Sequence, residues 1–403
     1  MTVDYRKDRI LVPASELKPG AVDLLNKILE DAGVGQPLQQ PEVSVPAAST
    51  SALVALPVTG ADPMAIRDIV QAHAQREGAA APTVALDIPY SAGTIDTGTF
   101  YAAGRKSGHG AATWLPAPAD QMPPKPPWPQ STNYPVIALL DSGVQPHHWL
   151  PPGNHPPFFV NATAYGWHQP ELPQPPKPPT QPPLGTHWGH ATFIAGLIRM
   201  TAPNAQILSM RVMNAAGQVN DEQLVDALNW LADNHGRVRA DIALMAFGRC
   251  RDEPHDHPLD HVKKAISRLA GCGMKIVASA GNDGSALPVY PAAFAADPDL
   301  SHSVVSVGAL GSPTQWAPFS DYGPWVREAR KGTGIISVLP QTAVGLGEQQ
   351  VSEKDPFHDL VMTPAPDGFA WWSGTSFAAA IYAGQYASTL PGSEGLPEPD
   401  ARP

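Results

Sequence analysis

The sequence predicts an α/β protein: a doubly wound, mainly parallel sheet flanked by helices, preceded by a small N-terminal α+β domain. Two observations lead to this fold class. From residue 136 onward, short continuous apolar runs alternate with helical segments, and such runs are typical of parallel strands that are buried on both faces. Before residue 90, two amphipathic helical segments alternate with three shorter apolar runs.

The composition fits a soluble chain with two or three domains. It has 403 residues, of which 43% are hydrophobic, so it contains enough apolar surface for a large core. The net charge of −11 argues against nucleic acid as a partner. Two cysteines, Cys250 and Cys272, leave room for one disulfide, but so low a number fits a reducing compartment better.

Two features of the hydropathy pattern bear on where in the cell the protein is expected. The first residues contain no apolar signal-peptide region. The chain also contains no apolar run of about 18 residues, the length that a membrane span requires. We therefore expect a cytoplasmic protein with no membrane partner, unless a leader has been trimmed from the chain.

Residues 1–90 are expected to form the N-terminal α+β domain, in the order strand, helix, strand, helix, strand. Its strands are predicted at 10–12, 53–56 and 84–88. The first helix is expected to begin near Pro19 and to end at Gly33, because proline suits a first helical turn and glycine suits a helix end.

Both helices of this domain carry an apolar face. In the first helix we expect that face to contain Ala21, Leu24, Leu25, Ile28, Leu29 and Ala32. The second helix opens at Asp62 and Pro63, which suit the N-cap and the first helical position. Its inward residues are expected to be Ile66, Ile69, Val70 and Ala74.

Proline marks the boundaries between the parts of the chain. There are 47 prolines, concentrated around 116–135 and 169–183. We interpret residues 91–133 as an extended, semi-rigid linker and 169–183 as a surface insertion. Either segment also resembles the proline-rich ligands of aromatic-lined grooves, so a protein partner is the alternative to a simple spacer. Residues 392–403 are expected to be a disordered tail.

Residues 134–391 are expected to form the main α/β domain. The predicted strands are 136–140, 206–213, 241–247, 274–280, 303–308 and 334–338. The clearest helix is 221–235, which Asn220 caps and Gly236 ends. In an open parallel sheet, ligands bind beyond the carboxyl ends of the strands, so this edge is where we expect the functional residues.

Four short segments place one chemically useful side chain each at such a position. They supply a carboxylate (Asp141), an imidazole (His190), a carboxamide (Asn282) and a hydroxyl (Ser376). Nucleophilic acyl transfer needs these parts together: a hydroxyl, a base that deprotonates it, a carboxylate that orients the base, and a donor to the oxyanion.

Each of the four residues also has a purely structural interpretation. Asp141 and Asn282 occur in sequences that are typical of turns. His190 is also compatible with a core histidine, and Ser376 with an ordinary helix N-cap. The functional interpretation depends on all four occurring at matching junctions of a single sheet.

The flanking residues resemble the subtilisin-like serine peptidases, or subtilases. The segments IALLDSGV, GHATFIAG, SAGND and SGTSFAAA are similar to the family's Asp, His, Asn and Ser motifs, in the family's order. The resemblance implies that Asp141 orients His190, that His190 is the general base and acid, and that Ser376 is the nucleophile. It also implies that Asn282 and the Ser376 backbone N–H bind the oxyanion.

The resemblance further implies a substrate-binding region. An extended peptide is expected to pair with an edge formed by Met245, Ala246, Phe247 and Gly248. Ala280 and Gly281 are expected to help line the pocket for the residue before the cleaved bond. The sequence departs from the family pattern at Ala191, where glycine is usual, and at Ala380, where proline is usual.

The predicted function is a serine endopeptidase that acts on polypeptides without a cofactor. Calcium is compatible with the resemblance, but no ligands can be assigned, and no metal is expected. More weakly, residues 1–90 resemble a subtilase propeptide, which implies activation by cleavage within about 91–133. The alternatives are a catalytically impaired pseudo-peptidase that binds peptides and a scaffold that recruits partners through its proline-rich segments.

Overall fold

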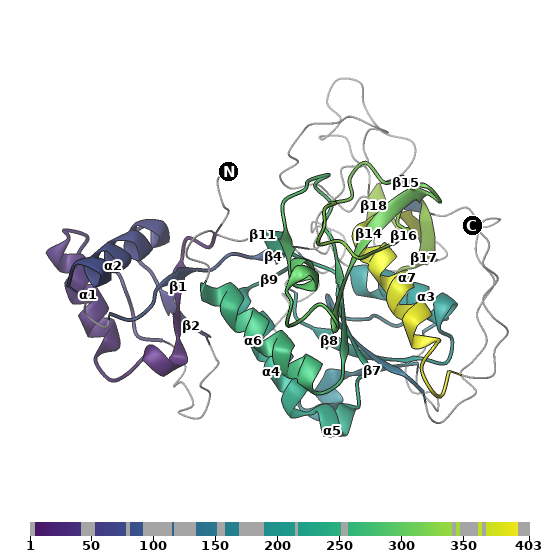
Figure 1. The fold of residues 1–403 in the computed structure, drawn as a ribbon, viewed down its shortest axis with the longest axis horizontal. Coiled ribbons are helices and arrows are strands. Elements are labelled where there is room, and N and C mark those ends of the chain that lie inside the picture. The colour runs from purple at the N-terminus through teal and green to yellow at the C-terminus, as the bar shows by residue number, and fades with distance from the viewer. Residues whose placement is uncertain are drawn as a thin grey trace, which may run out of the picture. The chain divides into compact units, whose positions relative to one another are not determined.

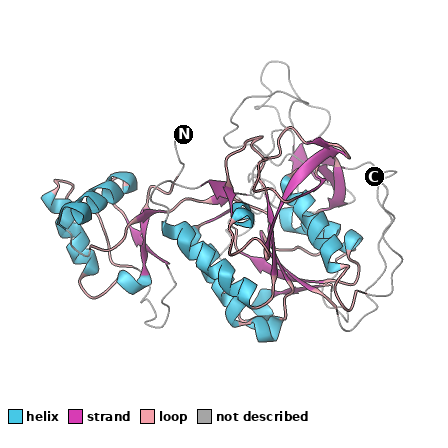
Figure 2. Cartoon of the chain, viewed as in Figure 1, coloured by secondary structure: helices cyan, strands magenta, loops and turns pink. Residues whose placement is uncertain are grey.

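The structure is a computed structural model of the chain (Figures 1 and 2). It describes residues 5–41, 53–77, 81–91, 115–116, 134–150, 158–168, 189–213, 217–250, 257–340, 344–346, 362–364 and 368–393. The predicted insertion at 169–183 lies outside these residues, as do nearly all of the predicted linker 91–133 and of the predicted tail 392–403.

The chain divides into two compact units, each of which consists of three separate segments of the sequence. The first contains Met1–Tyr90, Val219–Asp233 and Arg249–Leu269. The second contains Ser91–Gln218, Asn234–Gly248 and Ala270–Pro403. The domain boundaries drawn from the sequence stay a prediction.

A mainly parallel sheet forms the centre of the second unit. Its strands lie in the order β15 (Gln315–Trp316), β14 (Val304–Ser312), β12 (Lys275–Ser279), β10 (Ile242–Met245), β6 (Val136–Asp141), β8 (Gln206–Arg211) and β7 (Phe159–Asn161), and β16 (Glu328–Lys331) also pairs with β14. All of these pairings are parallel except that of β15 with β14. The predicted fold class is therefore confirmed.

The continuous apolar runs indicated these strands correctly because the strands are buried on both faces. Every residue of β6 and of β10 is buried. Five of the six predicted strands lie in this sheet at nearly the predicted positions.

The sixth predicted strand, 334–338, is present but belongs to a different sheet. It forms β17 (Ile335–Val338), which pairs antiparallel with β20 (Phe369–Trp372), and β20 pairs with β5 (Leu115–Pro116). A short apolar run shows that a strand is buried, but its partner is chosen by residues that are distant in the sequence.

Two helices that carry alanine and glycine among larger residues pack side by side in the second unit (Figure 1). They are α3 (His190–Thr201) and α7 (Thr375–Ala387), and α7 also contacts β10, β12 and β14. A Cβ atom added to Gly384 of α7 would overlap Thr201 Oγ1 and lie 2.9 Å from Thr201 Cβ. The small residues of these helices therefore let their backbones approach closely.

The first unit contains an antiparallel sheet in the order β2 (Leu53–Pro57), β1 (Arg9–Pro13) and β3 (Ala85–Leu86). Its helices are α1 (Ala21–Asp31), α2 (Pro63–Glu77), α4 (Asp221–Asp233) and most of α6 (His257–Gly271). Buried residues of α1 and α2, among them Leu25, Leu29, Ile66 and Val70, form a core with β1 and β2.

Two details of the predicted helices need correction. Leu24 is 43% exposed and Ala32 is also exposed, because the buried stripe of α1 runs through Val22, Leu25, Ile28 and Leu29. Helix α4 ends at Asp233, and Gly236 lies inside a further short helix, α5 (His235–Val238). The predicted N-cap is confirmed, since Asn220 Oδ1 accepts the Gln223 N–H at 2.8 Å.

Short elements complete the described fold. The strands are β4 (Tyr90–Ser91), β9 (Gln218–Val219), β11 (Arg249–Cys250), β13 (Val289–Tyr290), β18 (Val344–Leu346) and β19 (Met362–Pro364). The 3₁₀ helices are Ala14–Glu16, Ala162–Tyr165 and Ala292–Ala296. Both cysteines are free thiols. Among the helices that the structure describes, none has the length and apolar character of a membrane span.

Candidate active site

Asp141 and His190 meet at the carboxyl edge of the central sheet. Asp141 is the last residue of β6, and His190 is the first residue of α3. His190 Nδ1 lies 3.0 and 2.9 Å from the two carboxylate oxygens of Asp141, and both side chains are buried. This contact favours a proton on Nδ1, which leaves Nε2 as the basic nitrogen.

The His190 ring is held by aromatic side chains. The ring centroids of Trp372 and Phe377 each lie 5.6 Å from that of His190. Phe377 directly follows Ser376, so the imidazole lies beside the N-terminus of α7. Together with the Asp141 contact, this packing fixes the orientation of the ring.

Ser376 is the second residue of α7. It is buried, and its Oγ donates a hydrogen bond to the carbonyl oxygen of Ala246 at 3.0 Å. Ala246 directly follows β10, so the hydroxyl lies at the carboxyl end of the central strands, as the sequence predicts.

Asn282 is fixed by the residue that precedes Ser376. Its Oδ1 accepts hydrogen bonds from the Thr375 N–H and from Thr375 Oγ1, each at 2.9 Å. Thr375 Oγ1 in turn accepts the Gly281 N–H at 3.2 Å. The Asn282 Nδ2 atom lies 3.8 Å from a Cβ position built on Gly374, so the amide donor is next to the start of α7.

Asp321 holds the loop that carries Asn282. It is buried, and its Oδ1 accepts the N–H groups of Asp283 at 3.1 Å and Ser285 at 2.7 Å. Burial raises the pKa of Asp321 to about 7, although these two hydrogen bonds act in the opposite direction. A side chain at Gly281, whose φ is +113°, would overlap Asp321 Oδ2.

Sequence reasoning missed both Thr375 and Asp321 as parts of this region. Thr375 had a signal, since it lies between the glycine and the serine of the Gly-Thr-Ser segment. The signal for Asp321 was weaker. It lies in the stretch APFSDYG (317–323), which supports the family resemblance but does not indicate what the aspartate contacts.

The predicted peptide-binding edge needs one correction. Met245 is paired on both sides, with Ala278 of β12 and with Leu140 of β6, so it is interior to the sheet. Ala246, Phe247 and Gly248 lie beyond the end of β10. The correction arises because the sequence does not show where a buried strand stops pairing.

Ala280 and Gly281 lie directly after β12 and lead into Asn282. Ala280 is buried, and its N–H donates to the Val307 carbonyl oxygen at 2.9 Å. Ala191, one of the departures from the family pattern, also lies in the core, and its N–H donates to Ser142 Oγ at 3.2 Å.

The described part of the chain shows no group of side chains suited to a metal ion. Among the described residues, no group of at least 3 His, Cys, Asp or Glu side chains could hold a metal ion.

Several curated relatives of this chain are proteases. Over 228 residues, 54% of this chain, it is 30% identical to the minor extracellular protease Epr of Bacillus subtilis (strain 168), and it spans 30% of that protein. It is 26% identical to thermitase of Thermoactinomyces vulgaris over 214 residues, 51% of this chain and 65% of thermitase. The chain therefore matches only part of the length of these relatives.

A solved structure also matches the chain. The crystal structure of a cold adapted subtilisin-like serine proteinase has a TM-score of 0.41 and 21% sequence identity, and it covers 64% of this chain and 76% of its own. A family model described as the Subtilase family matches residues 132–396, which contain all four predicted site residues. The chain therefore belongs to the subtilase family.

Proposed function

We propose that the chain is a serine endopeptidase in which Asp141, His190 and Ser376 form a catalytic triad. The observation that carries the proposal is the buried contact of both Asp141 carboxylate oxygens with His190 Nδ1, beside the helix terminus that carries Ser376. A carboxylate in this position stabilises the imidazolium that forms when the histidine accepts a proton.

The reaction follows from the groups present. Ser376 Oγ attacks the carbonyl carbon of a peptide bond while its proton passes to His190 Nε2. The oxyanion accepts hydrogen bonds from Asn282 Nδ2 and the Ser376 N–H. When the C–N bond breaks, the imidazolium gives its proton to the leaving amine, and water then hydrolyses the acyl-serine by the same steps in reverse.

The Ser376 hydroxyl must first leave the Ala246 carbonyl oxygen, to which it donates in this structure. Rotation about the Cα–Cβ bond of Ser376 redirects it toward the imidazole. The loss of one neutral hydrogen bond costs about 1 kcal/mol, which is small beside the barrier of peptide hydrolysis.

A fluorophosphonate probe tests the triad directly. The wild-type chain should be labelled covalently, and labelling should vanish in Ser376→Ala and fall strongly in His190→Ala. Ser388→Ala, at a serine that follows α7, is the matched control and should be labelled like the wild type. Absence of labelling in the wild type, even after limited proteolysis between residues 91 and 133, would favour the peptide-binding pseudo-peptidase.

We also propose that residues 1–90 act as a removable inhibitory domain. The support is the composition of the first unit, which joins these residues to Val219–Asp233 and Arg249–Leu269, two segments of the family match. Tyr90 donates through its hydroxyl to Asp221 Oδ1 at 2.8 Å, and Arg249 binds the same oxygen at 3.0 Å.

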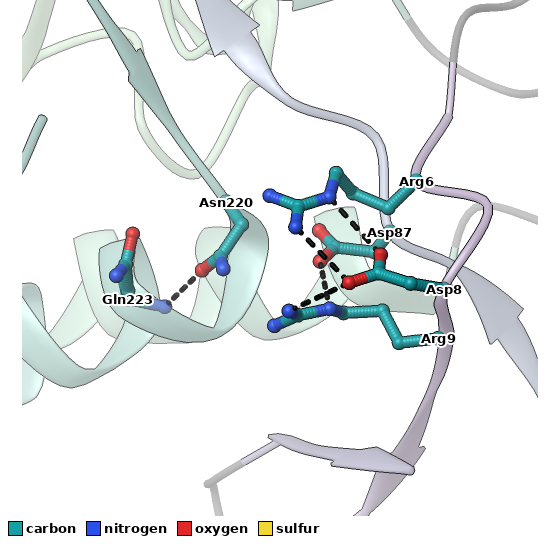
Figure 3. Close-up of polar contacts among 6 residues, drawn as sticks. All are labelled: Arg6, Asp8, Arg9, Asp87, Asn220 and Gln223. Carbon is teal, nitrogen blue, oxygen red and sulfur yellow. Dashed lines mark hydrogen bonds and ion pairs between the residues drawn. The ribbon is translucent and has the colours of Figure 1, made fainter. Parts of the chain in front are cut away.

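Charged residues of the N-terminal segment lie near the start of α4. Figure 3 shows Arg6, Asp8, Arg9 and Asp87 next to the start of α4. Arg6 and Arg9 bind Asp8 at 3.2 and 3.1 Å, and Arg9 Nε lies 4.0 Å from Asp87 Oδ2.

Self-cleavage tests the inhibitory role. Purified wild-type chain should shorten itself within about 91–133, and Ser376→Ala should stay intact. If the full-length chain hydrolyses peptides as fast as the shortened form, residues 1–90 do not inhibit it. Their role would then be recognition of another partner.

A further inference from the structure

The loop that carries Asn282 is joined to the loop that carries Asp321 by backbone hydrogen bonds. The Asp321 N–H donates to the Gly281 carbonyl oxygen at 3.0 Å, and the Tyr322 N–H donates to the Ser285 carbonyl oxygen at 2.9 Å. Gly281 directly precedes Asn282, the proposed oxyanion donor. A change at Asp321 therefore reaches Asn282 through one hydrogen bond and one residue.

The two carboxyl oxygens of Asp321 lie in different surroundings. Asp321 is 0% exposed, and its Oδ1 accepts the backbone N–H groups of Asp283 and Ser285. Oδ2 is also buried, but no group that the structure describes forms a hydrogen bond with it. It faces Gly281, where an added Cβ atom would overlap it. A negative charge on Oδ2 would therefore lie in the interior without a donor, which is costly.

The charged surroundings of Asp321 also oppose its ionisation. Among the described residues, the charged group that acts on it is Asp283, an exposed carboxylate of the Asn282 loop, and no cation offsets the effect. Burial raises the pKa of Asp321 to about 7, and Asp283 acts in the same direction, while the N–H groups of Ser285 and Asp283 act against it. The carboxyl group therefore changes its charge near neutral pH.

The charge of Asp321 matters because the proposed reaction builds a second negative charge nearby. The oxyanion forms beside Asn282 and the Ser376 N–H, and an ionised carboxylate in the adjoining loop raises its energy. An ionised Oδ2 also requires a donor, and Gly281 has to move to admit one, which displaces Asn282. Both effects lower kcat, and neither occurs while Asp321 is neutral.

We propose that Asp321 is a positioning residue that supports catalysis in its neutral form, and that its ionisation lowers kcat at alkaline pH. This inference rests on the proposed function. His190 has to be neutral to accept the Ser376 proton, so activity first rises with pH as the imidazole loses its proton. Ionisation of Asp321 then lowers it, so kcat passes through a maximum near neutral pH.

The test is the pH profile of kcat with one peptide substrate. In the wild-type chain, kcat should fall roughly threefold or more from neutral pH to about pH 9.5, with little change in KM. Asp321→Asn keeps the acceptor oxygen for the two N–H groups but cannot ionise. Its kcat should be close to that of the wild type near pH 7 and should reach a plateau at higher pH instead of falling.

Two further variants separate the charge of Asp321 from a purely structural role. Asp283→Asn leaves Asp321 in place but removes the charge that opposes its ionisation, so the alkaline fall should remain and its midpoint should move to lower pH. Asp299→Asn, at an exposed aspartate outside both loops, is the matched control and should keep the wild-type profile.

Fluorophosphonate labelling at pH 7 counts the active enzyme in each variant, and return from alkaline pH to pH 7 should restore kcat. A wild-type kcat that stays constant at alkaline pH, or that is not restored, overturns the inference, as does the same fall in Asp321→Asn. If Asp321→Asn does not fold, an unshifted midpoint in Asp283→Asn overturns it. A wild-type chain that neither reacts with the probe nor cleaves any peptide overturns the proposed function, and this inference falls with it.

Discussion

Thr375 is the residue through which helix α7 and the loop of Asn282 are joined. Its N–H and hydroxyl both donate to Asn282 Oδ1, and its hydroxyl accepts the Gly281 N–H. Because the oxygen and the nitrogen of a carboxamide point in different directions from the carbon that they share, the bonds to Oδ1 fix the direction of Nδ2. The orientation of the proposed oxyanion donor therefore depends on the threonine next to the nucleophile.

Replacement of Asn282 by alanine should affect the transition state and not the ground state. We expect kcat to fall by roughly 10²–10³ with little change in KM, because the donor acts on a charge that develops during the reaction. Steady-state kinetics on one peptide substrate measure both constants. A large rise in KM with unchanged kcat would reassign Asn282 to substrate binding.

Asp321 should affect catalysis because it holds the loop that carries Asn282. Asp321→Ala removes the acceptor of the Asp283 and Ser285 N–H groups, and we expect kcat to fall at least tenfold as Asn282 loses its position. Asp321→Asn keeps an acceptor oxygen and should stay within a few-fold of the wild type.

The raised pKa of Asp321 also predicts how the stability of the chain depends on pH. Because burial raises this pKa to about 7, the folded chain holds a proton that the unfolded chain loses near pH 4. Stability should therefore fall as the pH rises from about 4 to 7. Asp321→Asn should weaken this dependence, and thermal unfolding at pH 5 and pH 8 measures it.

At the scale of elements, the contact of α3 with α7 depends on glycine. Gly384→Ala should destabilise the chain even though alanine favours a helix by about 1 kcal/mol, because overpacking costs typically 1–3 kcal/mol. The added methyl would overlap Thr201, whose hydroxyl donates to the Leu197 carbonyl oxygen at 2.8 Å. We expect a melting temperature that is lower by a few degrees.

Gly236→Ala is the matched control for that change. Gly236 lies in α5, and a Cβ atom there would have no atom within 4 Å. The substitution should leave the melting temperature unchanged or raise it slightly. Equal losses in both variants would mean that backbone effects, and not the contact of α3 with α7, explain the result.

At the scale of the whole molecule, the first unit contains buried carboxyl groups that respond to pH. Burial raises the pKa of Asp87 to about 7, and Asp221 acts in the same direction while Arg9 and Arg6 oppose it. Partial burial also raises the pKa of Glu222 to about 7. Neutral carboxyl groups therefore favour the assembly of residues 1–90 with α4.

The sign of the pH dependence follows from these directions. Between about pH 4 and pH 7 the folded unit keeps protons that the unfolded chain has released, so its stability falls as the pH rises. For Asp87 alone, the loss between pH 5 and pH 8 should be roughly 2 kcal/mol. The measurement uses Ser376→Ala, which is expected not to cleave itself. Hydrogen exchange of its β1 amides, corrected for intrinsic exchange rates, should show faster opening at pH 8 than at pH 5.

Asp87→Asn should flatten this dependence, because it removes the buried titrating group. Asp68→Asn is the control, since the Asp68 side chain is 59% exposed in the same unit. Exchange that does not depend on pH in the wild type, or an equal effect of both substitutions, would contradict the proposed role of Asp87.

The sequence by itself determined which elements form and which residues are the candidates for the chemistry. Apolar runs located the central strands, and Asp141, His190, Asn282 and Ser376 were recognisable because each follows a strand or starts a helix. These are local properties, since the period of the apolar residues and the residues at element ends depend only on near neighbours.

Only the tertiary structure decided what those residues contact. It placed β17 in a separate sheet and Met245 inside the central one, held Asn282 through Thr375 and Asp321, and inserted Val289 between Gly248 and Gly281. Pairing, burial and the resulting pKa values depend on residues far apart in the sequence, and no local pattern encodes which distant segment arrives at a given place.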